Sequence, residues 1–566
     1  MTSSAFENRP WLRQYDAGVA TSLQYPGQTV PEMYTRSIAA HADRTALAFM
    51  GKRLSYAQLG NQARSFATYL KRIGLQPGDR VVMVLPNTPH FPVVYHAIHL
   101  CGGVVVPASP LDTAAEVFYK VENSGARLVV FLDLLYEQVK SCEQIPGLLA
   151  MVGCDISDYL PFPKNLFFPI RKKFLGRTLP AYGQSADASI SILRYRSILK
   201  QNAPLSSDED VALTPDDLAV ILYTGGTTGV SKGVMLSHRA LVVNVTQGQT
   251  WVGFQRDDVI LCVLPFFHGF GMSMGMNLGL FSGAECILNP RFDSAVVLKH
   301  LAKDKVTMFA GVPTMYIALM SHPDFAKLRG TALRGCFVGA APVPETLKQK
   351  FYERTGGILI EGYGLTETVT ANCALPYQGL KKEKSIGIPW PDTEFRIVDV
   401  DDPDKELGID QEGELLVRTP AMMMGYWENP EATAQTIRNG WLHTGDICSM
   451  DADGYFYIVD RKKDLIISGG FNVYPTEIEE VLYMHKHVRE ACVIGVPDDY
   501  KGEVPKAYIV SEPEHNVSES DLHKFLEERL IKYKVPKYFE FREVLPKSPI
   551  GKILRKELRK EHEKNK

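Results

Sequence analysis

Cysteine pairs, excess charge and long apolar runs are all missing from this sequence of 566 residues. None of its nine cysteines forms a Cys-x-x-Cys pair or a Cys/His cluster at zinc spacing. A disulfide scaffold is therefore excluded, and a reducing cytosol is the compartment that we expect. The 62 basic and 65 acidic residues give a net charge of −3. Since the whole protein has no basic field to gather nucleic acid, we expect no nucleic-acid partner.

No run of about 18 apolar residues is present, so the sequence predicts no membrane-spanning helix. The nearest run, 91–108, is interrupted by His96, His99 and a glycine pair, and we interpret it as buried core. The N-terminal residues include acids and lack the apolar core of a signal peptide. We therefore expect a soluble cytoplasmic protein, or one bound peripherally at the inner face of a membrane.

Apolar strand patterns alternate with helical patterns along the first 220 residues. Residues 58–70 have helical spacing, whereas 80–86, 128–132 and 218–223 are short apolar runs. Strands that alternate with amphipathic helices are typical of an α/β architecture with buried parallel strands.

A change in composition near residue 460 marks an expected domain boundary. The segment 460–464, Asp-Arg-Lys-Lys-Asp, is charged and joins two apolar segments. Residues 461–566 then show strand and helix patterns in turn, and they have the size of an independent small domain. We predict an α/β N-terminal domain over 1–460 and a small α/β C-terminal domain over 461–566. The charged segment is either the hinge between them or an ordinary surface loop.

The segment 159–177 is unusual because aromatic and apolar residues interleave with five cations. These cations are Lys164, Arg171, Lys172, Lys173 and Arg177. Such a stretch can lie in a membrane interface, where each cation near an anionic surface contributes about 1 kcal/mol. The alternative is a surface loop whose aromatics pack on the domain, since prolines interrupt a long amphipathic helix.

The strongest local signal is Tyr-Thr-Gly-Gly-Thr-Thr-Gly-Val-Ser-Lys-Gly at 223–233. Its glycines allow a tight loop whose backbone N–H groups face phosphate oxygens, while hydroxyls and a lysine add further donors. It is not a Walker loop, because Gly229 precedes Lys232 by three residues and Gly233 stands where Ser or Thr is expected. The candidate phosphate-binding residues are Thr224, Gly225, Gly226, Thr227, Thr228, Gly229, Ser231 and Lys232.

Four further segments follow in order. They are Tyr-Gly-Leu-Thr-Glu-Thr at 363–368, Trp-Leu-His-Thr-Gly-Asp at 441–446, Asp-Arg-Lys-Lys-Asp-Leu-Ile at 460–466 and Pro-Lys-Ser-Pro-Ile-Gly-Lys-Ile-Leu-Arg at 546–555. With the 223–233 loop they resemble the five motifs of the adenylate-forming superfamily, which contains acyl-CoA synthetases, luciferases and peptide-synthetase adenylation domains. Within it the chain most resembles bacterial long-chain fatty acyl-CoA synthetases, although Asn439 replaces the aspartate of that group's motif.

The resemblance implies a ligase that works in two steps with ATP, Mg²⁺ and coenzyme A. A long- or medium-chain fatty acid would form an acyl-adenylate with release of pyrophosphate, and coenzyme A would then take the acyl group with release of AMP. Two related enzymes remain open: a fatty acyl-AMP ligase that loads a carrier protein, and a ligase for aryl or other acids. A non-catalytic adenylate- or acyl-binding module is a third alternative, and a homodimer is an open possibility.

The resemblance also implies the residues of the first step. Lys552 would neutralise charge that develops on the α-phosphate and the carboxylate. His268 would contact the acyl carboxylate, or it is an ordinary core histidine, and Thr366 would lie near the α-phosphate. Glu367 would hold Mg²⁺, since a hard cation prefers an oxygen ligand.

The nucleotide would lie between two further motifs. Tyr363 would place its ring on adenine, and Asp446 would accept hydrogen bonds from the ribose hydroxyls, with Arg461 beside it. The resemblance implies a large multi-layer N-terminal domain of sheets and helices and a small, mobile α+β C-terminal domain. Lys463 matches the hinge of the superfamily, after which the C-terminal domain would rotate for thioester formation. Further nucleotide or coenzyme A contacts are implied for Gly339, Ala340, Ala341, Glu361, Gly362, Gly364, Gly469 and Gly470.

The acyl chain has a less specific signal. The methionine-rich stretch 270–276 and the segment 306–313 would line an acyl tunnel, or they are plain core. The sequence gives no chain-length preference.

Overall fold

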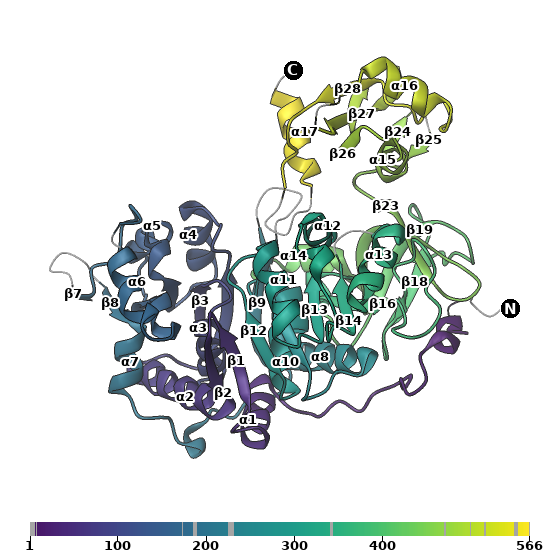
Figure 1. Ribbon diagram of the computed structural model, residues 1–566. Coiled ribbons are helices and arrows are strands. Elements are labelled where there is room, and N and C mark those ends of the chain that lie inside the picture. Colours follow the sequence, from purple (N-terminus) through teal and green to yellow (C-terminus); the bar gives the residue numbers. More distant parts are fainter. Residues whose placement is uncertain are drawn as a thin grey trace.

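The computed structural model describes residues 6, 8–172, 174–184, 190–224, 231–339, 343–468, 471–498, 500–513, 515, 517–547 and 553–564. Within these residues the strands form two nine-stranded and two five-stranded sheets. Three sheets and their helices make up one large body, and the last sheet belongs to a small C-terminal body (Figure 1). The predicted fold class, a large α/β domain followed by a small α+β domain, is confirmed.

The first nine-stranded sheet contains the apolar runs of the N-terminal half. It comprises β3 (Arg80–Val84), β4 (Val104–Ala108), β5 (Leu128–Leu132), β6 (Ala150–Cys154), β7 (Gly183–Gln184), β8 (Ser191–Arg194), β9 (Leu218–Thr224), β10 (Lys232–Ser237) and β20 (Gly425–Tyr426). Strands β4, β5 and β6 are buried along their whole length, as expected for parallel strands that helices cover on both faces. Strands β9 and β10 pair antiparallel, with Thr224 opposite Lys232, so the described ends of the 223–233 motif lie side by side.

The helices of this half of the chain lie before and between these strands in the sequence. They are α1 (Val30–Ala40), α2 (Tyr56–Arg72), α3 (His90–Leu100), α4 (Ala114–Asn123), α5 (Tyr136–Val139), α6 (Lys164–Lys172) and α7 (Tyr195–Gln201). Helix α2 begins with a capping box, in which the Ser55 hydroxyl accepts from the Gln58 N–H and the Ser55 N–H donates to the Gln58 side chain. The predictions of a helix over 58–70 and a buried run over 91–108 are confirmed.

The second nine-stranded sheet brings together distant parts of the chain. It comprises β1 (Thr45–Phe49), β2 (Lys52–Ser55), β11 (Val259–Cys262), β12 (Glu285–Leu288), β13 (Met308–Gly311), β14 (Gly335–Val338), β15 (Ile358–Gly364), β16 (Ala371–Ala374) and β17 (Ile388–Pro389). Its helices are α8 (His238–Val252), α9 (Gly269–Gly271), α10 (Leu278–Phe281), α11 (Ser294–Lys303), α12 (Pro313–Ser321) and α13 (Glu345–Thr355). The parallel strands β13, β14 and β15 end side by side, and the 363–368 motif begins in the last of them.

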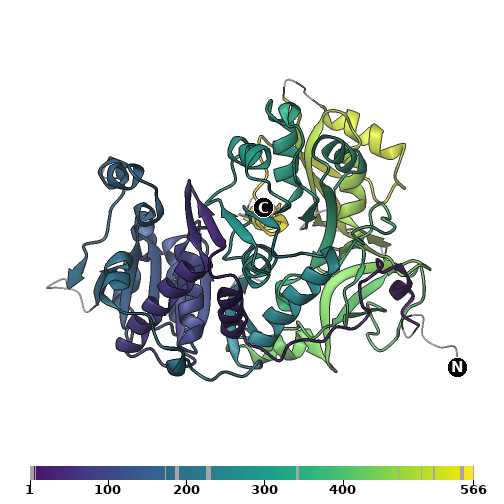
Figure 2. The same cartoon turned by 60° about the horizontal axis from the view of Figure 1, so that its bottom comes forward.

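A third, antiparallel sheet completes the large body. It comprises β18 (Glu394–Val398), β19 (Gly413–Arg418), β21 (Ile437–Arg438), β22 (Trp441–Met450) and β23 (Phe456–Arg461), and α14 (Pro430–Thr436) precedes β21. The N-terminal segment reaches this sheet, where Trp11 packs on Phe456, and then runs along the outside of the molecule to α1 (Figure 2).

The small body follows directly after β23. It comprises β24 (Ile466–Ser468), β25 (Phe471–Val473), β26 (Val488–Asp498), β27 (Gly502–Ser511) and β28 (Tyr538–Phe541), with α15 (Pro475–Tyr483), α16 (Glu519–Glu527) and α17 (Arg555–Lys564). Among the described residues of the whole chain, no helix has both the length and the apolar character needed to cross a membrane.

Candidate active site

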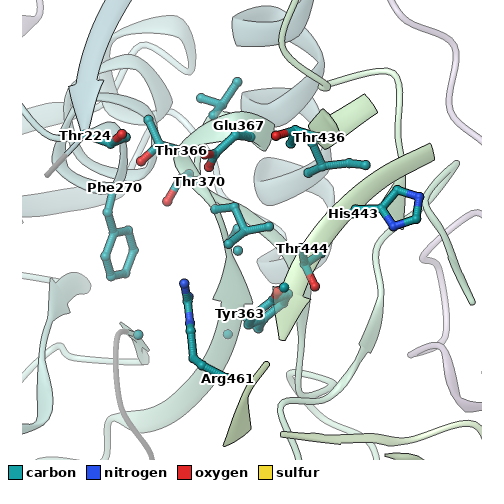
Figure 3. Close-up of a pocket in the computed structure, with 18 of the residues that line it drawn as sticks. Thr224, Phe270, Tyr363, Thr366, Glu367, Thr370, Thr436, His443, Thr444 and Arg461 are labelled. Carbon is teal, nitrogen blue, oxygen red and sulfur yellow. The ribbon is translucent and has the colours of Figure 1, made fainter. Parts of the chain in front are cut away.

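A cavity of about 540 Å³ lies where the motifs of the large body converge. Its walls come from the end of β9, the loop after β11, the ends of β14 and β15, the segment 364–371, and β22. Figure 3 shows Tyr363 and Arg461 on one side, with Thr366, Glu367 and Thr370 together on the opposite side. Ligands of open α/β sheets bind outside the carboxyl ends of the strands, which is where this cavity lies.

Asp446 is the centre of a buried polar triad. The Tyr363 hydroxyl donates to Asp446 Oδ2 over 2.6 Å, and Arg461 Nε lies 2.6 Å from Asp446 Oδ1. The register of β22 and β23 sets the second contact, because Asp446 and Arg461 are paired across these strands. Each carboxylate oxygen keeps further acceptor capacity, so the triad can still receive donors from a bound sugar.

The charges within this triad support one another. Burial, with the charge of Asp446 adding to it, raises the pKa of Tyr363 well above its usual value. Burial alone would lower the pKa of Arg461, but the carboxylate of Asp446 raises it overall. Asp446 itself is only 2% exposed.

The opposite wall carries oxygen ligands and a cation. Glu367 Oε1 accepts from the Tyr426 hydroxyl over 2.8 Å, and Lys232 Nζ lies 5.0 Å from the centre of the Tyr426 ring. The hydroxyls of Thr224 and Thr366 line the same part of the cavity. Among the described residues, no group of three His, Cys, Asp or Glu side chains is placed to hold a metal. One carboxylate nevertheless fits Mg²⁺, which is usually bound by one or two carboxylates together with substrate phosphates.

A strained turn follows Glu367. Val369 has φ 67° and ψ −61°, and the Thr370 N–H donates to the Thr368 carbonyl over 2.8 Å, which makes a γ-turn of the rare kind with positive φ. A β-branched residue is rarely found there, and such strain gathers at functional sites.

Two glycines accommodate this turn. A Cβ at Gly269 would lie 2.1 Å from the Val369 carbonyl oxygen, and one at Gly364 would lie 1.6 Å from the Thr370 carbonyl oxygen. The loop that carries His268 therefore packs backbone to backbone against the loop that carries Glu367.

His268 lines the cavity as a neutral ring. Its Nδ1 accepts from the Phe270 N–H over 3.2 Å, which leaves Nε2 to carry the proton and to donate. Burial lowers the pKa of His268 to about 4. At neutral pH this side chain offers a hydrogen bond to a carboxylate but not a positive charge.

The predicted residues divide into three groups. Those that line the cavity are Thr224, Lys232, His268, Gly339, Gly362, Tyr363, Gly364, Thr366, Glu367 and Arg461. Glu361 and Asp446 are not among the lining residues. The Glu361 side chain accepts from the Val343 N–H over 2.7 Å and pairs with Lys348, and Asp446 is held by Tyr363 and Arg461. The predictions for Gly225, Gly226, Thr227, Thr228, Gly229, Ala340, Ala341, Gly469, Gly470 and Lys552 lie outside the described residues.

The methionine-rich stretch contributes little to this cavity. Met272, Met274 and Met276 are fully buried and are not among its lining residues, which matches the plain-core alternative rather than the acyl tunnel. Of the two segments considered, Phe270 and Val312 line the cavity, together with Leu264, Pro265 and Phe337.

A second charged group at the rim of the cavity was not predicted from the sequence. Lys462 Nζ lies 3.1 Å from Glu414 Oε2, and His443 Nδ1 lies 3.7 Å from Glu414 Oε1. Burial would raise the pKa of Glu414, but the hydrogen bonds from His443 and Lys462 lower it to about 2. His443 and Lys462 lie inside recognised motifs, whereas no sequence signal marks Glu414.

Comparisons with known proteins agree with this geometry. The family model of the AMP-binding enzyme matches residues 34–427, and that of the AMP-binding enzyme C-terminal domain matches residues 477–552. The chain is 39% identical over 560 residues to a long-chain-fatty-acid–CoA ligase of Bacillus subtilis, covering 98% of this chain and 99% of that protein. It is 37% identical over 558 residues to the ligase of that name in Escherichia coli O157:H7, covering 97% and 98%. The ATP-bound crystal structure of MatB from Rhodopseudomonas palustris aligns with a TM-score of 0.79 at 30% identity, covering 94% of this chain and 99% of that one.

Proposed function

The chain belongs to the AMP-binding enzyme family, the adenylate-forming superfamily that its five motifs predicted, and we propose that it is a long-chain fatty acid–CoA ligase. The observation that carries this proposal is the convergence of two groups in one cavity. The triad of Tyr363, Asp446 and Arg461 suits a nucleoside, and the opposite wall with Lys232 and Glu367 suits its phosphates. The near full-length similarity to ligases of that name supports the choice of substrate.

The reaction has two balanced steps. A carboxylate oxygen of the fatty acid attacks the α-phosphorus of ATP, and the bond to pyrophosphate breaks. The sulfur of coenzyme A then attacks the acyl carbonyl carbon, and AMP leaves. Both reactants of the first step are anions, so the protein contributes mainly by positioning them and by neutralising charge.

The roles of individual side chains are part of the proposal. Asp446 would accept from the ribose hydroxyls once Arg461 moves to the α-phosphate, and the ring of Tyr363 would lie against adenine. Neutral His268 would donate from Nε2 to the acyl carboxylate. Lys552, which lies outside the described residues, would supply the cation of the first step, as the superfamily motif implies.

Mg²⁺ is proposed as the metal of the first step. Glu367 would hold it, with the hydroxyls of Thr224 and Thr366 close by. When bound, the ion would offset the charge of the triphosphate.

The apolar part of the cavity would receive the start of the acyl chain. Leu264, Phe270, Val312 and Phe337 provide that surface. Each buried CH₂ favours binding by about 0.8 kcal/mol, so a long chain gains most if the cavity opens further. We propose a cytoplasmic enzyme whose peripheral contact with a membrane brings it to such water-insoluble substrates.

A mass-spectrometric assay tests the proposal. The protein is incubated with Mg-ATP, coenzyme A and an equimolar panel of short- to long-chain fatty acids, benzoate and coumarate. Long-chain acyl-CoA formed together with AMP is the expected result. Aryl-CoA as the main product would contradict the substrate, and acyl-adenylate without acyl-CoA would indicate a carrier protein as acceptor.

A further inference from the structure

Helix α6 and its flanking residues present an apolar face to solvent. Phe162 is 79% exposed and Phe174 is 83% exposed. Between them, Leu166, Phe167 and Ile170 are 59% to 63% exposed. Leu166, Phe167 and Ile170 lie on one side of α6, and Phe162 and Phe174 flank the two ends of the helix. We call these five apolar side chains the α6 face.

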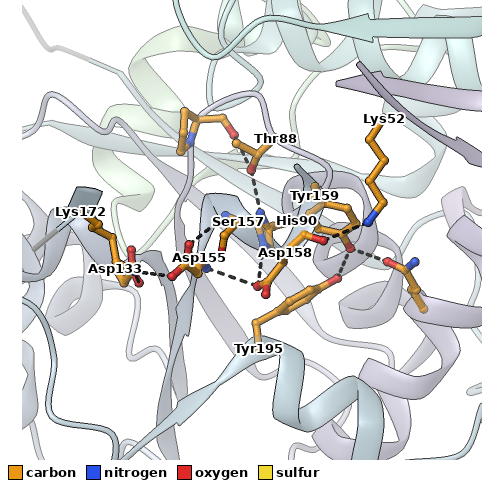
Figure 4. A network of polar contacts seen from close by, with 12 residues as sticks. Lys52, Thr88, His90, Asp133, Asp155, Ser157, Asp158, Tyr159, Lys172 and Tyr195 are labelled. Carbon is orange, nitrogen blue, oxygen red and sulfur yellow. Dashed lines mark hydrogen bonds and ion pairs between the residues drawn. The ribbon is translucent and has the colours of Figure 1, made fainter. Parts of the chain in front are cut away.

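Packing inside the domain fixes the direction of the α6 face. Lys172, at the end of α6, is only 6% exposed, and its Nζ lies 2.5 Å from Asp133 Oδ2 and also pairs with Asp155 (Figure 4). Asp155 is itself fixed by the Ser157 N–H over 2.8 Å. Within α6, Lys172 and the partly buried Phe168 face the domain, whereas Leu166, Phe167 and Ile170 face solvent.

The surroundings of the α6 face are cationic. Lys164, Arg171 and Arg177 are exposed next to it, and the sequence has no acid between residues 159 and 186. The nearby Glu137 pairs with Lys140. A cluster of large exposed apolar side chains rimmed by cations marks a surface that binds something apolar and anionic.

We propose that the α6 face docks on an anionic lipid bilayer. Phe162, Leu166, Phe167, Ile170 and Phe174 enter the boundary between headgroups and acyl chains, while the three exposed cations meet the lipid phosphates. The surface is narrower than the predicted 159–177 segment, because Tyr159, Leu160 and Lys172 face the protein interior. The proposal deepens the proposed function, since it places the ligase where long-chain acids dissolve.

A fluorescent variant tests insertion directly. Of the five native tryptophans, Trp11, Trp251, Trp390 and Trp441 are buried, so Phe167→Trp adds an exposed reporter. With vesicles of equal parts phosphatidylcholine and phosphatidylglycerol, its emission should shift to the blue and be quenched by bromine-labelled lipid. An emission spectrum that vesicles leave unchanged would overturn insertion at this helix.

Co-sedimentation of the full-length protein with the same vesicles tests the α6 face as a whole. The triple variant Phe162→Ser/Phe167→Ser/Phe174→Ser should bind at least tenfold more weakly. Arg171→Gln should bind anionic vesicles about fivefold more weakly, and its binding to vesicles without anionic lipid should not change. Leu111→Ser is the matched control, since Leu111 is 70% exposed but lies outside the α6 face, and it should bind like the parent protein.

The remaining outcomes separate this proposal from the ligase function. Pyrophosphate release with detergent-dispersed acid should be unchanged in the triple variant, which also shows that it folds. If the protein has ligase activity but does not bind vesicles, the docking proposal is refuted and the proposed function is not affected. If the parent protein is a dimer that does not bind vesicles, and the same three substitutions dissociate it, the α6 face binds a second copy of the chain instead.

Discussion

Replacing Tyr363 with phenylalanine removes one atom from the polar triad and leaves the aromatic ring in place. The lost contact is the 2.6 Å hydrogen bond from the tyrosine hydroxyl to Asp446 Oδ2. A hydrogen bond to a charged group is worth about 1.5–3 kcal/mol. If the oriented carboxylate binds ribose, kcat/KM for ATP should fall about 10- to 150-fold. The KM for coenzyme A should stay the same, because the triad acts before the thiol enters.

The assay is pyrophosphate release at varied ATP, with urea denaturation of the same samples. Tyr457→Phe is the matched control: Tyr457 lies on β23 away from the cavity, and its hydroxyl donates to Asp451 Oδ2 over 2.9 Å. The control should lose some stability and keep its kinetics. If Tyr363→Phe also lost only stability, the triad would be structural, and the assignment of Asp446 to ribose would be refuted.

Three further predictions concern the loops and the core. Gly269→Ala places a methyl group 2.1 Å from the Val369 carbonyl oxygen. The free energy of unfolding should therefore fall by about 1–3 kcal/mol, and the KM for the fatty acid should rise. Unchanged values would contradict the close packing of the two loops. Glu367→Gln should raise the Mg²⁺ concentration that gives half-maximal pyrophosphate release, and an unshifted Mg²⁺ titration would remove this residue from the metal site. Burial lowers the pKa of His96 to about 3 and of His238 to about 4, whereas both titrate near 6.5 in the unfolded chain. The free energy of unfolding should therefore be constant above pH 6.5 and fall by about 2 kcal/mol per histidine at pH 5. Urea denaturation would show this as a lower midpoint at pH 5. Equal midpoints at pH 7.5 and pH 5 would contradict the prediction.

The fold was accessible from the sequence because its strongest signals are local. Apolar runs such as β5 are buried along their whole length, and the Ser55–Gln58 capping box starts α2. Periodicity and caps depend on neighbours a few residues apart, so one chain suffices to detect them. The motif segments at 363–368 and 441–446 can likewise be recognised from the sequence alone, without knowledge of the contact between them.

Side-chain directions and backbone strain could not be predicted from the sequence. Glu361 lies within two residues of Tyr363 on β15, yet only Tyr363 faces the cavity, because Lys348 and the Val343 N–H hold the glutamate elsewhere. The positive φ of Val369 has no sequence signal, since a β-branched residue is a poor choice for it. Both features depend on contacts between distant segments, which a single sequence does not encode in readable form.

Two ion pairs lie on either side of Lys463, the predicted hinge. On one side of it, Arg461 belongs to β23 and is tied to the large body through Asp446. On the other side, Asp464 pairs with Arg559 of α17 over 2.8 Å and so belongs to the small body. The two anchors are three residues apart, which leaves little chain between them to absorb a rotation. If Arg461 leaves Asp446 Oδ1 for the α-phosphate, as proposed above, nucleotide binding would remove an anchor next to the proposed hinge. It would thereby link the first chemical step to the movement that the second step needs.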